Sequence, residues 1–145
     1  MMIPEINYWA VLIVTLLSMG LGALWYSPVM FLNRWAKLAR IDLGAQQGAP
    51  VAVPMLVAFA VTFLTAWVLA GSVAIAWHFY EGDFFVAAIV TGVTLWAGFT
   101  ASRFITHDVF EGRPSQLTVL NIGFELATVL IMTIVIGLWP PAGTV

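Results

Sequence analysis

Four side chains able to do acid–base or metal chemistry lie in one short stretch, HDVFEGRP, at residues 107–114. They are His107, Asp108, Glu111 and Arg113. We call them the cytoplasmic cluster, because the orientation predicted below puts them on the cytoplasmic side of the membrane. His107 and Glu111 stand four residues apart, so on a helical turn both could reach one metal ion. Two such ligands are easily found by chance, and Gly112 and Pro114 are typical of a turn that ends one helix and begins another. We therefore expect a polar turn between helices and no metal site.

A second polar group follows the turn, at a spacing that places it on one face of a helix. Its members are Thr118, Asn121, Glu125 and Thr128. What this stripe can do depends on the solvent around the helix, and the composition of the chain decides that.

The composition indicates that the solvent is lipid. Of the 145 residues, 62% are hydrophobic and 8% are charged, whereas soluble domains are about 45–50% apolar and about 25% charged. So few charges cannot cover so much apolar surface in water. The net charge of −2 gives no indication of nucleic-acid binding. The absence of cysteine excludes disulfides and thiolate metal sites, and we expect no cofactor.

Four apolar runs are long enough to cross roughly 30 Å of hydrocarbon. They cover about residues 7–30, 53–77, 84–105 and 116–139. They lack the alternation of barrel strands, and a backbone in lipid must satisfy its own hydrogen bonds, so we expect helices. The prediction is an all-α transmembrane four-helix bundle, with residues 1–145 forming a single integral membrane domain.

The basic residues predict the orientation. They lie in or beside the first and third connections and are Arg34, Lys37, Arg40, Arg103 and Arg113. Because basic residues favour the cytoplasmic side, we expect both connections there and both termini outside the cytoplasm. The first connection, NRWAKLARIDLGAQQGAP, is either a short amphipathic helix lying in the interface, where anionic lipid attracts its cations, or an irregular basic loop.

In this arrangement Glu125 lies about nine residues into the fourth span, roughly 14 Å deep. A charged carboxylate there costs at least about 2.5 kcal/mol, so it must be protonated, paired or facing water. It is either a functional group or a structural hydrogen-bond partner of a neighbouring helix. Arg103 is the natural partner, unless its long side chain extends to the membrane surface instead. We call Glu125, Asn121, Arg103, Thr118 and Thr128 the predicted polar seam.

Small residues at every fourth position predict which helix faces pack together, because membrane helices associate where small side chains allow close approach. The second span has Ala58, Thr62, Ala66, Ala70 and Ala74, the first has Ser18 and Gly22, and the third has Thr94, Gly98 and Ser102.

Two stretches resemble an uncharacterised bacterial membrane family, domain of unknown function 1761. They read LGALWYSPVMFLNRW at the end of the first span and VFEGRPSQLTVLNIGFEL from the third connection onward, with a closing IGLW. The matching residues are Trp25, Tyr26, Ser27 and Pro28 in the first stretch, and Phe110, Glu111, Gly112, Arg113, Pro114, Asn121 and Gly123 in the second. The resemblance implies that many relatives have histidine at the position of Glu125. The resemblance implies a four-span architecture in a bacterial inner membrane, and it implies no activity.

The residues of the first motif also have a physical interpretation. Trp25 and Tyr26 would anchor at headgroup level, Pro28 would kink or end the helix, and the Ser27 hydroxyl would satisfy a freed backbone group.

Three functions remain open. The first is an interaction or accessory subunit that assembles with itself or with a larger membrane complex. The second is a small-solute or proton-coupled transporter that works as an oligomer through Glu125, Asn121, Arg103 and His107. The third is a membrane enzyme acting on a lipid or quinone at the cytoplasmic face through His107, Asp108 and Glu111. No enzyme motif argues for the third.

Overall fold

The computed structural model describes residues 5–45, 48 and 50–142, and this part of the chain is helical without any β-strand. Within it, four helices are long and apolar enough to cross a membrane: Tyr8–Trp25, Ala52–Tyr80, Phe84–Phe110 and Ser115–Leu138. The predicted all-α, four-span architecture is therefore confirmed.

Helix α1 (Tyr8–Trp25) is shorter than the predicted first span, which extended to Met30. Its start is capped by Asn7, whose Oδ1 accepts hydrogen bonds from the backbone N–H groups of Trp9 and Ala10 at 3.1 Å. The helix ends before Pro28, which cannot donate a backbone hydrogen bond. After this corner the chain forms α2 (Leu32–Ala39), so the first connection contains the short helix and is not simply an irregular loop.

The third span is continuous but not uniform. Helix α4 (Phe84–Leu95) leads into a π-helical turn, η1 (Trp96–Ala101), and then into α5 (Ser102–Phe110). A turn follows in which Gly112 has a φ of 65°, and α6 (Ser115–Leu138) begins directly after Pro114. The sequence prediction of a helix–turn–helix connection around Gly112 and Pro114 is thus confirmed.

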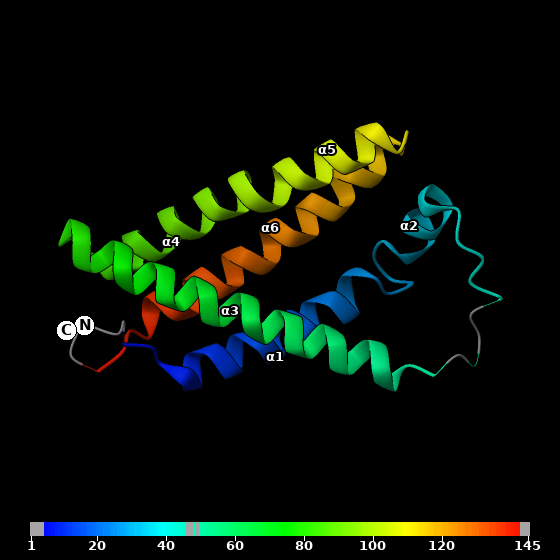
Figure 1. Ribbon diagram of the computed structural model, residues 1–145. Coiled ribbons are helices and arrows are strands. Elements are labelled where there is room, and N and C mark those ends of the chain that lie inside the picture. Colours follow the sequence, from blue (N-terminus) through cyan, green and yellow to red (C-terminus); the bar gives the residue numbers. More distant parts are fainter. Residues whose placement is uncertain (1–4, 46–47, 49, 143–145) are drawn as a thin grey trace.

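Figure 1 shows that the α4–η1–α5 span and α6 run side by side, whereas α1 and α3 (Ala52–Tyr80) form the other side of the bundle. Helix α2 and the α5–α6 turn lie at the same end of the molecule. At the other end, Asn7 Nδ2 donates a hydrogen bond of 3.2 Å to the backbone oxygen of Trp139, which joins the start of α1 to the end of α6.

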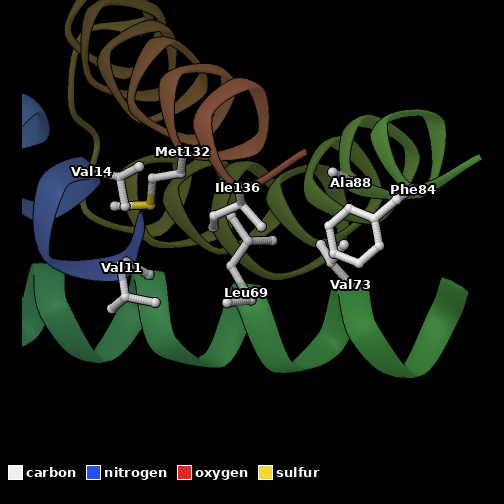
Figure 2. Close-up of a cluster of buried hydrophobic side chains, with 10 residues drawn as sticks. Val11, Val14, Leu69, Val73, Phe84, Ala88, Met132 and Ile136 are labelled. Atoms are coloured by element: carbon white, nitrogen blue, oxygen red, sulfur yellow. The ribbon is translucent and has the colours of Figure 1, made fainter. Parts of the chain in front are cut away.

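The core lies where α1, α3, α4 and α6 meet, nearer the end that carries Asn7 and Trp139. Val11 and Val14 of α1, Leu69 and Val73 of α3, Phe84 and Ala88 of α4, and Met132 and Ile136 of α6 converge there (Figure 2). Ala66, Ala70 and Ala74 are buried, so the predicted packing face of the second span is confirmed in its second half, and Ser18 of the first span is buried as well.

The predicted packing face of the third span is wrong. Thr94, Gly98 and Ser102 are exposed, and a Cβ added at Gly98 would meet nothing within 4 Å. The span packs on α6 through Ala88 and Gly92 instead. Gly92 and Thr94 lie two residues apart in α4 and therefore on opposite sides of it, so the face that meets α6 is not the face that carries Thr94.

Candidate functional site

An aromatic cluster forms where α1 ends and the chain turns into α2. The Tyr26 ring packs edge-on against Phe124 of α6 at 5.2 Å and against Trp35 of α2 at 5.5 Å, measured between ring centroids. Trp25 lies 4.8 Å from Phe31 and 6.0 Å from Phe124 by the same measure. Trp25 and Tyr26 were expected to anchor at headgroup level; the structure uses them to attach the α1–α2 corner to α6.

Tyr26 also reaches the polar stripe of α6. Its hydroxyl donates a hydrogen bond of 3.3 Å to Asn121 Oδ1. Burial, and next the neighbouring Glu125 carboxylate, raise the pKa of Tyr26, which lies beyond the end of α1, to about 12. The hydroxyl therefore remains a donor at any physiological pH. Sequence reasoning placed Tyr26 and Asn121 in separate motifs and missed this contact, because only the fold brings α1 and α6 together.

Glu125 is half-buried beside this contact, and no hydrogen bond or ion pair from the described residues reaches its carboxyl group. Arg103, the partner considered from sequence, is exposed and makes no ion pair with Glu125 in this part of the chain. The structure thus keeps Asn121, Glu125 and Tyr26 together and leaves Arg103 outside the group.

Thr118, the first residue of the predicted stripe, belongs to the α5–α6 turn. Its hydroxyl donates a hydrogen bond of 2.7 Å to Oδ2 of Asp108, which is 5% exposed. Arg113 Nε lies 3.8 Å from Asp108 Oδ1 and 2.5 Å from Glu111 Oε2, and the Arg113 backbone N–H donates to the Asp108 backbone oxygen at 2.9 Å. These contacts fasten the turn to the start of α6.

Within the cytoplasmic cluster, Arg113 lies in ion-pair distance of both Asp108 and Glu111. His107 is exposed, while Glu111 is engaged with Arg113. Among the residues that the structure describes, no group of three or more His, Cys, Asp or Glu side chains could hold a metal ion. Asp108, Glu111 and Arg113, three of the four members of the cluster, stabilise the turn between α5 and α6 together, and we call these three residues the turn lock.

Several buried polar atoms lack a hydrogen-bond partner in the described chain. They are Ser18 Oγ, Trp25 Nε1, Ser27 Oγ and Thr128 Oγ1. The expectation that the Ser27 hydroxyl satisfies a freed backbone group is therefore wrong; the Ser27 backbone oxygen instead accepts from the N–H groups of Met30 and Leu32. Ser18 and Thr128 lie on α1 and α6, which pack against each other. Buried hydroxyls of this kind normally bond to protein or to water.

One further contact has no signal in the local sequence. Trp96, the first residue of η1, donates from Nε1 to the backbone oxygen of Ile122 at 3.2 Å. This bond satisfies the indole inside the bundle and connects the π-helical turn to the segment of α6 between Asn121 and Glu125.

The four apolar helices and the polar groups enclosed between them define a multi-pass helical membrane protein, which fits a lipid bilayer as its environment. The chain matches the model of a family described as "Protein of unknown function (DUF1761)" over residues 9–137. It belongs to that family, as the WYSP and FEGRP stretches indicated. No curated protein and no solved structure matches the chain.

Proposed function

We propose that this protein is a membrane interaction subunit that assembles with a second copy of itself. One observation carries the proposal: the chain places Arg103 and Glu125, two groups of opposite charge, inside its spans and does not pair them. Ionisable residues within membrane spans usually pair with one another, because an unpaired charge in hydrocarbon costs at least about 2.5 kcal/mol.

The depths of the two residues suit a pair between copies. Arg103 precedes the end of its span at Phe110 by about seven residues, which is roughly 10 Å of helix. Glu125 follows the start of α6 at Ser115 by about ten residues, or roughly 15 Å, measured from the same end of the bundle. The long aliphatic stem of arginine can cover such a difference. In a two-fold symmetric dimer each copy would supply one arginine and one glutamate, giving two equivalent pairs.

The face beside Arg103 supports close approach of another helix. Thr94, Gly98 and Ser102 form an exposed strip of small residues that packs on no helix of the described chain. The Ser102 hydroxyl donates a hydrogen bond to the Gly98 backbone oxygen of the same span, so it needs no hydrogen-bond acceptor outside the protein. Small side chains let two backbones come close, and Arg103 follows Ser102 directly.

Mixed expression tests the pairing between copies. Arg103→Gln and Glu125→Gln homodimers each lack both pairs, and we expect each variant alone to dimerise at least about tenfold more weakly than the original protein, since removing one partner leaves the other charge buried. Differently tagged Arg103→Gln and Glu125→Gln copies expressed together regain one pair, so they should co-purify in mild detergent more strongly than either variant with itself. Arg34→Gln, outside the spans, is the matched control.

Two results would contradict the proposal. The original protein could be monomeric in a lipid bilayer, or the mixed pair could associate no better than the separate variants. A stable complex with a different membrane protein in place of the second copy would identify the larger assembly as the physiological one.

A second candidate function, proton or small-solute transport by the oligomer, is favoured by the unpartnered hydroxyls. Ser18 Oγ on α1 and Thr128 Oγ1 on α6, the helix that carries Glu125, are buried, and buried polar groups without protein partners commonly bind water. A water-filled connection here would let Glu125 exchange protons. Proton flux into vesicles holding the protein, abolished by Glu125→Gln while the dimer persists, would support transport; no flux above that of empty vesicles would exclude it.

We also propose that the protein lies in the cytoplasmic membrane of a bacterium with both termini outside. All five basic residues are in or beside the first and third connections, and α2 and the α5–α6 turn share one end of the bundle (Figure 1).

A further inference from the structure

Helix α2 separates its charged residues from its packed residues. Arg34, Lys37 and Arg40 are exposed, whereas Ala36 is 4% exposed and faces the bundle. Helix α2 packs on α6, and the Trp35 ring rests on Tyr26 at 5.5 Å. The apolar side of α2 is thus already occupied by the protein, and its cations are left on the free side.

None of these three cations is neutralised by the described chain. The ion pairs in this part of the structure involve Arg113 with Asp108 and Glu111. The nearest acid in the sequence, Asp42, accepts a hydrogen bond of 2.8 Å from the Gly44 backbone N–H, and forms no ion pair with α2. Three of the five basic residues of an otherwise slightly acidic chain therefore form an uncompensated basic surface on α2 and the residue that caps its end, Arg40.

The end of α2 has a non-glycine residue, Arg40, in the left-handed conformation, as the end of α3 does at Glu81. Arg40 has φ 57° and ψ 42°, the left-handed conformation in which glycine is normally found at this position. The Ile41 backbone N–H closes the helix by donating to the Ala36 backbone oxygen at 2.9 Å. A non-glycine residue is strained in this conformation.

We propose that the exposed side of α2 is a binding surface for anionic phospholipid headgroups, held by Arg34, Lys37 and Arg40. The bilayer is the favoured partner because α2 stands at the end of four membrane-spanning helices, beside an aromatic cluster of the type enriched at membrane interfaces. Basic clusters directly beside membrane helices attract anionic lipids by charge complementarity. The surface uses neither Arg103 nor Glu125, so this inference stands independently of the proposed assembly.

The test compares lipid retention. The full-length protein in mild detergent is given equal amounts of phosphatidylglycerol and phosphatidylcholine with identical acyl chains. Native mass spectrometry then measures how much of each lipid remains bound to the protein. We expect a preference for phosphatidylglycerol of about fivefold for each basic side chain in contact at low ionic strength. The preference should weaken as salt is added.

Two variants separate charge from structure. Replacing Arg34, Lys37 and Arg40 together by glutamine should abolish the preference, whereas exchanging lysine and arginine at the same positions should preserve most of it. Arg40→Gly is the sharper variant, because glycine relieves the left-handed strain while removing one cation. It should keep or raise the thermal stability and still lower the preference for phosphatidylglycerol about fivefold.

Three results would overturn the proposal. The original protein could retain both lipids equally, or the triple glutamine variant could keep the full preference. Alternatively, millimolar inorganic phosphate could displace phosphatidylglycerol completely, which would show that the surface binds free phosphate and not a lipid headgroup.

Discussion

Gly92 is the position at which the packing of the third span on α6 can be tested by one methyl group. A Cβ added there would collide with Thr133 Cγ2 and lie 3.1 Å from Val129 Cγ1. Thr133 is fully buried, and its hydroxyl donates to the Leu130 backbone oxygen at 3.0 Å, so its methyl group cannot move without disturbing that bond. Overpacking of this kind costs about 1–3 kcal/mol.

Gly20 provides the matched control, because it also lies inside a helix, and a Cβ added there would meet nothing within 4 Å. Replacing glycine by alanine in a helix otherwise stabilises by roughly 0.5–1 kcal/mol at both sites. The difference between Gly92→Ala and Gly20→Ala therefore isolates the collision, and we expect Gly92→Ala to be less stable by about 1–3 kcal/mol. Thermal or denaturant unfolding in one detergent measures this difference.

The collision also predicts a specific rescue. Thr133→Ala removes the methyl group in question, so Gly92→Ala combined with Thr133→Ala should lose less stability than the sum of the two single changes. If Gly92→Ala were as stable as Gly20→Ala, or if the two changes were strictly additive, the close approach of α4 to α6 at Gly92 would be refuted.

Three further predictions concern the site and the topology. Thr118→Val should lower the free energy of unfolding by about 1–3 kcal/mol, because it leaves the buried Asp108 carboxylate without its hydroxyl donor at 2.7 Å. Thr118→Ser keeps that hydroxyl and should have almost no effect. Equal losses for the two variants in an unfolding assay would show that the hydroxyl does not stabilise the turn lock. Tyr26→Phe should cost about 0.5–1.5 kcal/mol through the lost bond to Asn121, and Tyr80→Phe, at an exposed position, should be neutral in the same assay. A reporter active only in the cytoplasm should be inactive when fused to the C-terminus, and strong activity would reverse the predicted orientation.

The fold class followed from the sequence because it depends on local properties. An apolar run of about 20 residues in lipid must be a helix, whatever its neighbours are. The turn at Gly112 and Pro114 was equally local, because it rests on the allowed φ of glycine and the fixed φ of proline. The α1–α2 corner was only partly predictable: Pro28 indicated an end to the helix, but the helix stops at Trp25.

The faces that meet were decided only by the tertiary structure. Periodicity shows that Thr94, Gly98 and Ser102 share a face, but not whether that face meets α6 or the surroundings. The contact falls on Gly92, on the opposite side of α4 from Thr94, and the π-helical turn that begins at Trp96 changes the register of the residues after it. No single residue type in the sequence predicts a π-helical turn.

For the polar residues too, the sequence predicted which of them share a helix face, and the tertiary structure decided which partners they meet. Sequence spacing grouped Thr118, Asn121 and Glu125 correctly on one helix face, because that is a property of one helix. Which partner each of them meets depends on how the helices cross: Thr118 bonds to Asp108 of α5, Asn121 bonds to Tyr26 at the end of α1, and Glu125 is left without a donor from the described chain. Single-helix geometry is encoded locally, whereas pairing between helices depends on the packing of the whole bundle.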